Sequence, residues 1–147
     1  MNSNNESPRI VLADDDADDR MMACEAFDEA RVANPIDTVV DGEDLLDYLH
    51  RRGRHADRPA GNPGLILLDL NMPRMDGREA LAAIKSDENL RRIPVVVLTT
   101  SKAEEDLLRT YDLGVNSFIV KPVTFVGLVE VVRTLDHYWF TLVAQPA

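Results

Sequence analysis

Leu65-Ile66-Leu67-Leu68-Asp69 is the stretch that decides the fold of this 147-residue chain. Four consecutive aliphatic residues that end on an acid are typical of a strand buried on both faces of a parallel sheet. Similar apolar runs lie on both sides of it, at residues 9–13, 36–40, 93–99 and 117–120. We therefore expect five short strands, of which residues 65–69 form the third along the chain.

Amphipathic segments separate these strands and predict helices. Apolar side chains recur at helical spacing in residues 17–31, 43–51, 78–86, 102–113 and 124–138. Asp16 precedes the first of these segments and is expected to be its N-cap. Strand and helix alternate five times, which predicts a doubly wound α/β fold with a five-stranded parallel sheet. Residues 52–64 are rich in Arg, Gly and Pro and predict an exposed loop, with His55 at the surface.

The composition excludes several classes of function. With a formal net charge of −10 and only 5% aromatic residues, the chain should be repelled by nucleic acid and by anionic lipid. No apolar run approaches the roughly 20 residues that span a bilayer, so we expect no membrane segment. Cys24 is the single cysteine, which excludes an internal disulfide and suits a reducing compartment. We expect a cytoplasmic protein.

Acidic and polar side chains follow the strands at the points where they end. Asp14 and Asp15 follow the first strand, Asp69 ends the third, Thr99 ends the fourth and Lys121 follows the fifth. Ligands of such sheets bind outside the carboxyl ends of the strands, so these groups should converge. Crowded carboxylates attract a hard cation such as Mg²⁺, and a carboxylate can attack phosphorus to form an aspartyl phosphate. An ammonium and a hydroxyl then suit the phosphoryl oxygens.

The same residues resemble the response-regulator receiver domain of two-component signalling, which has a (βα)5 flavodoxin-like fold. Thr99 and Lys121 lie 30 and 52 positions after Asp69, both typical of receivers. The resemblance spans about residues 9–133. It is carried by Ile10-Val11-Leu12-Ala13-Asp14-Asp15-Asp16, Leu67-Leu68-Asp69-Leu70-Asn71-Met72-Pro73-Arg74-Met75-Asp76-Gly77, Pro94-Val95-Val96-Val97-Leu98-Thr99-Thr100-Ser101 and Phe118-Ile119-Val120-Lys121-Pro122.

The resemblance implies a role for each acid. Asp69 would be the phosphoacceptor. Asp15 and Asp69 would be ligands of Mg²⁺, together with the backbone carbonyl of Asn71, and Asp14 would act mostly through bound water. The chain would catalyse its own phosphorylation and slow dephosphorylation, and is not expected to be an enzyme with a separate substrate.

The resemblance also implies a switch. Thr99 would contact the phosphoryl group and move with it, and Lys121 would pair with a phosphoryl oxygen. Phe118 stands where receivers carry a switch aromatic, often Tyr, so that the side chain could change rotamer but lacks the hydroxyl. Output would pass to another protein, because no effector domain is expected after the fifth helix.

A narrower resemblance points to receivers that are paired with phytochrome-type histidine kinases. It rests on Asn116-Ser117-Phe118, Leu98-Thr99-Thr100-Ser101 and the Tyr138-Trp139 ending. The implied partners are a cognate histidine kinase of the bacteriophytochrome type and a downstream protein that the sequence does not name.

Three other interpretations of the acidic residues remain open. Asp14-Asp15-Asp16 has the D-x-D form of haloacid-dehalogenase-type phosphatases, with Asp14 as nucleophile and Asp16 as acid/base, although Asp69 would then be idle. Asp14 to Glu25 partly fits a calcium loop, but position six is Asp19 instead of Gly. A pseudo-receiver scaffold would leave the acidic set unexplained.

The chain is expected to divide into a disordered lead at residues 1–8, a receiver domain at 9–138 and an apolar tail at 139–147. Trp139, Phe140, Leu142 and Val143 lie in this tail. Because Phe125, Leu128, Val129 and Val132 already supply the core side of the last helix, the tail is left to form an interface. We expect a homodimer joined through the face of the fourth and fifth helices and this tail. The alternative is that the tail packs back on its own last helix.

Overall fold

The computed structural model describes residues 9–32, 34–70, 72, 75, 77–99, 117–120 and 124–143. Of residues 99, 117–120 and 135–143 it describes the backbone only. The expected helix at residues 102–113 lies outside this part of the chain, as does the expected disordered lead at residues 1–8.

A parallel sheet forms the centre of the described molecule. Its strands are β1 (Ile10–Ala13), β2 (Ile36–Val39), β3 (Leu65–Asp69), β4 (Val95–Thr99) and β5 (Ser117–Val120). Their order is β2-β1-β3-β4-β5, and every neighbouring pair is parallel. The chain therefore winds outward in both directions from β1 and β3, which confirms the doubly wound five-stranded sheet expected from the sequence.

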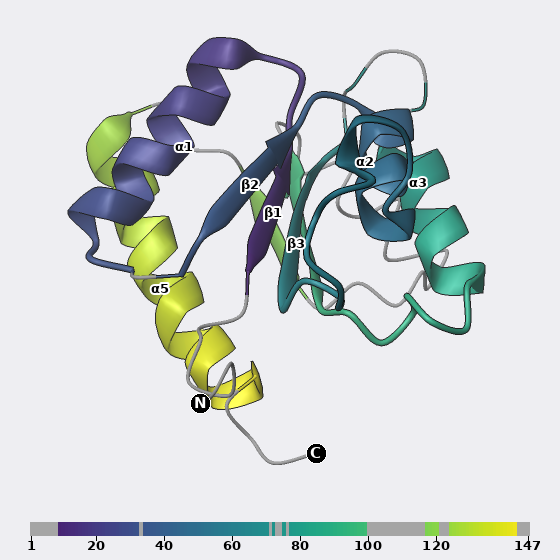
Figure 1. The fold of residues 1–147 in the computed structure, drawn as a ribbon. Coiled ribbons are helices and arrows are strands. Elements are labelled where there is room, and N and C mark those ends of the chain that lie inside the picture. The colour runs from purple at the N-terminus through teal and green to yellow at the C-terminus, as the bar shows by residue number, and fades with distance from the viewer. Residues whose placement is uncertain are drawn as a thin grey trace.

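Helices cover both faces of this sheet (Figure 1). Helices α1 (Ala17–Glu29) and α5 (Phe125–Val143) lie on one side, and α2 (Gly42–His50) and α3 (Gly77–Ser86) lie on the other. Alternate residues of each strand point to opposite faces. In β3, Leu65 and Leu67 pack in the cluster with Phe27 of α1, whereas Ile66 and Leu68 pack in the cluster with Leu45 of α2.

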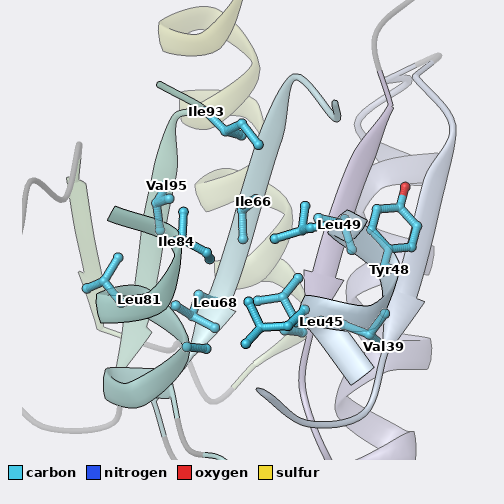
Figure 2. Close-up of a cluster of buried hydrophobic side chains, with 14 of the residues drawn as sticks. Val39, Leu45, Tyr48, Leu49, Ile66, Leu68, Leu81, Ile84, Ile93 and Val95 are labelled. Atoms are coloured by element: carbon cyan, nitrogen blue, oxygen red, sulfur yellow. The ribbon is translucent and has the colours of Figure 1, made fainter. Parts of the chain in front are cut away.

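Figure 2 shows the second of these clusters, between the sheet and the α2/α3 layer. Leu45 and Leu49 of α2 and Ile84 of α3 meet Ile66 and Leu68 of β3, all at most 5% exposed. Burial of a side chain of this size stabilises the fold by about 1.5–3 kcal/mol. The continuous aliphatic strands are thus explained by burial on both faces, and their carboxyl ends are left as the polar edge.

The ends of two helices differ from those expected. Helix α2 ends at His50, because Arg51 takes a left-handed conformation (φ 56°) and its N–H closes the helix on the carbonyl oxygens of Asp47 and Tyr48. Helix α5 continues to Val143, so the expected end at Tyr138 is wrong. Phe125 is also no core residue, since it is 38% exposed, whereas Val129 and Val132 are buried.

The loop after α2 is more ordered than expected. It contains a 3₁₀ turn, η2 (Gly53–His55). The side chain of His55 is only 10% exposed, so its expected surface position is wrong. Within the described residues, no helix is both long enough and apolar enough to cross a bilayer.

Candidate functional site

Three carboxylates meet at the carboxyl edge of the sheet. Asp14, Asp15 and Asp69 each present an oxygen, and these oxygens all lie within 4.8 Å of one another. Asp14 and Asp69 are 2% and 4% exposed, while Asp15 is exposed to solvent. The sequence predicted this convergence from the positions at which β1 and β3 end.

The register of the sheet explains why Asp14 and Asp69 are neighbours. Ala13 of β1 pairs with Leu68 of β3, so the next residue of each strand emerges at the same level. The backbone of Asp14 is fixed on both sides, because its N–H donates to the Val39 carbonyl (3.1 Å) and its carbonyl accepts from Arg20 Nη1 (2.8 Å). The acid therefore sits on a rigid strand end.

Asp16 does a different job from the two acids before it. Its carboxylate accepts from the N–H groups of Asp18 (2.8 Å) and Asp19 (3.1 Å), which makes it the N-cap of α1 as expected. Its own N–H donates to Asp14 Oδ1 (3.0 Å). This arrangement disfavours both the calcium loop and the phosphatase, because each of them needs the carboxylate of Asp16 in the site.

Two glycines hold the loop that follows Asp69. The Gly77 N–H donates to the Leu70 carbonyl (3.0 Å), and the Gly42 N–H, at the start of α2, donates to the Met75 carbonyl (2.8 Å). A Cβ on Gly77 would stand 2.5 Å from the backbone oxygen of Asp69. The close backbone approach thus requires a residue without a side chain at this position.

The chemistry of the acidic group suits a hard divalent cation. Three carboxylates this close repel one another, and two of them are largely withdrawn from water. Mg²⁺ prefers carboxylate and carbonyl oxygens and retains several waters, which the exposed position of Asp15 allows. The residues present therefore fit the metal expected from the sequence, with Asp14, Asp15 and Asp69 as the side chains that would hold it.

The other expected site residues are placed only in part. Thr99 ends β4 one position beyond Leu98, which pairs with Asp69, so its backbone lies at the same edge as the acids. Phe118 is in β5 and pairs with Val97. Asn71 and Lys121 lie outside the described residues. The roles assigned to the backbone carbonyl of Asn71 and to the side chains of Thr99, Phe118 and Lys121 stay predictions.

The protein family to which the chain belongs follows from its match to a known family profile. The profile of the response regulator receiver domain matches residues 10–133, which is most of the chain. The chain belongs to the response-regulator receiver family. The matched span includes every strand and both strand-end acids, Asp14 and Asp69, of this receiver.

Several relatives of the receiver share its fold over nearly its full length. It is 36% identical to the response regulator Rcp1 of Synechocystis over 149 residues, covering 100% of this chain and 99% of Rcp1. The crystal structure of the phosphorylated cyanobacterial phytochrome response regulator RcpA is 41% identical, with a TM-score of 0.82, 95% of this chain and 99% of RcpA covered. The response regulator RPA3017, in red light signaling of R. palustris, is 37% identical, with a TM-score of 0.84, and 96% and 99% are covered.

A metal-bound structure exists within this group. Rcp1 has been crystallised in a Mn²⁺-bound form, to which the receiver is 36% identical with a TM-score of 0.81 over 96% of its length and all of that chain. Divalent metal binding is thus a property of the family, and the receiver carries an acidic cluster that suits it.

One polar cluster of the receiver was not foreseen from the sequence. Asp44 in the first turn of α2 accepts from Arg54 Nη2 (2.6 Å) and lies 2.8 Å from His55 Nε2. Asp37 of β2 accepts from the Tyr48 hydroxyl (2.5 Å) and from Arg9. The only sequence signal is the density of arginines in residues 51–58, most of which lie in the segment 52–64 that the sequence predicts to be an exposed loop.

Proposed function

We propose that the receiver takes a phosphoryl group from a histidine kinase onto Asp69 and signals through contacts with other proteins. The observation that supports this most strongly is the acidic group, in which a buried carboxylate at the end of the central strand lies within 4.8 Å of two others. Three carboxylates this close together repel one another, and a bound divalent cation would relieve that repulsion beside the carboxylate that attacks phosphorus.

In the proposed reaction an oxygen of Asp69 attacks the phosphorus of a phosphohistidine. The new O–P bond forms as the N–P bond breaks, and the electron pair of that bond leaves with the imidazole of the kinase. Lys121 and Thr99 would bind the equatorial phosphoryl oxygens from neighbouring strand ends. Mg²⁺, held by Asp14, Asp15, Asp69 and the Asn71 carbonyl, would supply positive charge for the same oxygens.

The partners belong to the same proposal. RcpA is a cyanobacterial phytochrome response regulator, and RPA3017 is a response regulator in red light signaling. We propose a bacteriophytochrome as the cognate histidine kinase and a separate protein as the downstream target. The receiver would turn over no substrate other than its own phosphoryl group, and its lone Cys24 suits the reducing cytoplasm.

Phosphotransfer from a panel of labelled histidine kinases tests this function. A kinase of the phytochrome type should transfer label to the receiver within seconds to minutes, and unrelated kinases should transfer it far more slowly. If no kinase of the panel transfers label to the folded receiver in the presence of Mg²⁺, the proposal is contradicted.

The Asp15→Ala variant should bind Mg²⁺ more weakly and yet be more stable than wild type in EDTA. Removing one of three crowded carboxylates relieves repulsion in the metal-free protein and deletes one ligand of the cation. Thermal melts with and without Mg²⁺ measure both effects. We expect the Mg²⁺-induced rise in melting temperature to shrink by at least half.

Asp28→Ala is the matched control, because Asp28 is also exposed and lies on α1 away from the acidic group. It should leave the Mg²⁺-induced rise unchanged. Equal rises in Asp15→Ala and wild type would remove Asp15 from the ligand set.

We also propose that the receiver forms a homodimer through the face of its last helix and the tail at residues 139–147. Phe125 and Val126 of α5 are 38% and 68% exposed, so that this helix carries apolar surface that the described part of the protein does not cover. The helix also continues to Val143, which brings the first residues of the apolar tail into the same element. A two-fold pairing is the commonest way to bury such a surface.

The dimer should strengthen when Asp69 carries beryllofluoride, a phosphoryl mimic, because Thr99 and Phe118 would move this face. Light scattering should show more dimer with the mimic in wild type, no such increase in Thr99→Ala, and monomers in a chain stopped at Tyr138. If the full chain is monomeric at high micromolar concentration with and without the mimic, the tail has another role.

A further inference from the structure

A cluster of basic and acidic side chains lies beside β2, the outer strand of the sheet. A cavity of about 310 Å³ opens between β2, α2 and the loop after α2. Arg9 and Asp37 lie near the amino ends of β1 and β2, whereas Arg54 and His55 bind Asp44, which accepts from the Val40 N–H just after β2 ends. The lining of the cavity includes Arg9, Asp37, Tyr48, Arg54, His55 and Arg58.

The two carboxylates of this region are fully engaged by protein donors. Arg9 donates from Nε and Nη2 to the two oxygens of Asp37 (2.7 and 2.9 Å), and the Tyr48 hydroxyl, at the edge of the cluster in Figure 2, adds a third bond. Arg54 donates from Nε and Nη2 to Asp44 (3.1 and 2.6 Å). Each carboxylate thus neutralises one guanidinium.

These pairs persist at neutral pH. The hydrogen bond from Arg9 holds the pKa of Asp37 below its usual range. Burial would raise the pKa of Asp44, but the hydrogen bonds from Arg54 and His55 outweigh it and lower the pKa. Burial and the bond to Asp37 raise the pKa of Tyr48 to about 12, so that its hydroxyl stays neutral. The carboxylates therefore remain charged and the phenol does not.

Arg58 is left as the unneutralised cation of the cavity. Its guanidinium lies over the Tyr48 ring, 4.3 Å from the centroid, and donates only to carbonyl oxygens, those of Tyr48 (2.9 Å), Pro59 (3.2 Å) and Gly61 (2.9 Å). Its Nη2 is buried, and no acceptor among the described residues reaches it. Arg58 lines the cavity and forms no ion pair with a carboxylate of the described residues, so its guanidinium can take a further acceptor that enters the cavity.

The charge balance gives that acceptor a sign. Arg9 with Asp37 and Arg54 with Asp44 cancel, which leaves the Arg58 guanidinium without a carboxylate partner among the described residues. This positive charge stands out in a chain of net charge −10. A concave site with fixed guanidinium groups attracts oxyanions. The volume is at the lower end of small-molecule sites, which run from about 300 to 1,000 Å³.

We propose that this cavity binds the phosphate or carboxylate group of a small molecule, with Arg58 as the principal partner and Arg54 and His55 at its rim. The site is separate from the phosphoryl site, because none of the residues that line the cavity belongs to the acidic group. It does not depend on the proposed function of Asp69.

Titration of the ¹⁵N-labelled 147-residue chain tests the proposal, with inorganic phosphate and malonate as probes and chloride matched for ionic strength. Protein and buffers are freed of metal on a chelating resin, so that no soluble chelator competes for the cavity and no cation at the acidic edge binds the probes. We expect saturable shifts in the amide signals of Thr38, His55 and Arg58, but none at Asp15 or Leu70. A tighter response to phosphate would identify a phosphate-bearing ligand, and a tighter response to malonate a carboxylate.

Arg58→Gln should weaken binding at least about tenfold, because a charged hydrogen-bond donor is lost. Arg58→Lys keeps the positive charge but not the planar guanidinium, so it should bind the anion with intermediate affinity. It also serves as the test variant if Arg58→Gln does not fold. Arg92→Gln, on an exposed turn, is the matched control and should bind like wild type. The proposal fails if wild type shows no saturable shift at these amides, or if both Arg58 variants bind as tightly as wild type.

Discussion

The Asp69→Asn variant should take up no phosphoryl group above background from acetyl phosphate or from a histidine kinase. The amide is a poor nucleophile and cannot form the acyl phosphate, whereas its shape is close to that of the acid. Because the substitution removes one of three clustered negative charges, the metal-free variant should also melt at a higher temperature than wild type.

Asp28→Asn is the control for this experiment, since it removes an exposed acid of α1 and should label normally. Labelling is measured with acetyl phosphate in the presence of Mg²⁺, and folding by thermal melts of the same samples. A folded Asp69→Asn protein that labels as well as wild type would show that another group accepts the phosphoryl.

The Gly77→Ala variant should lose both stability and phosphorylation rate. The added methyl would stand 2.5 Å from the Asp69 carbonyl oxygen and 2.6 Å from Leu70 Cα, and backbone atoms cannot move aside cheaply. Overpacking of this kind typically costs about 1–3 kcal/mol. The relief must come from the segment that carries Asp69, so the acceptor itself should be displaced and the labelling rate should fall by about tenfold or more.

Gly53→Ala is the control that separates a loss of stability from a loss of phosphorylation rate. Gly53 has a positive φ of 61° but only Asp47 near its Cβ position, at 3.6 Å or more, so the variant should lose about 1 kcal/mol through backbone strain alone. Urea unfolding gives the stability of each variant, and acetyl phosphate labelling gives the rate. If Gly77→Ala labels as fast as Gly53→Ala, the close approach at Gly77 does not position Asp69.

The sheet and its acidic edge could be predicted because their signals are local and strong. The three inner strands β1, β3 and β4 are continuous aliphatic runs, and Asp14 and Asp69 follow directly where the runs of β1 and β3 stop. Parallel order then brings these ends together without further information, since strand ends in a parallel sheet share one edge. The N-cap role of Asp16 could also be predicted, because an N-cap side chain bonds to N–H groups within the next three residues.

The misplaced helix ends had weaker signals. Arg51 ends α2 in a left-handed conformation that the sequence does not mark with Gly. No Gly or Pro lies between Tyr138 and Val143, so nothing in the sequence stops α5 at Tyr138, and the helix continues. Because no helix-breaking residue follows Tyr138, the expected end of the last helix at this position had no local physical basis.

The basic cavity could not be predicted because its contacts are not local. Arg9 precedes β1 and Asp37 lies in β2, and the two meet Tyr48 of α2 only after the sheet has formed. Asp44 and His55 are 11 residues apart, a separation that no helical or strand period connects. A dense run of arginines gives the same sequence pattern whether it is solvated or paired, so only the packed chain distinguishes the two.

The most direct test of the central claim is to locate the phosphoryl group itself. Borohydride reduces an acyl phosphate to an alcohol, which leaves homoserine in place of the phosphorylated aspartate, and tandem mass spectrometry of the peptides identifies the position. After phosphorylation with Mg²⁺ present, we expect homoserine at position 69 and unmodified aspartate at positions 14 and 15. Homoserine at position 14, with position 69 unmodified, would contradict the account and favour the phosphatase arrangement.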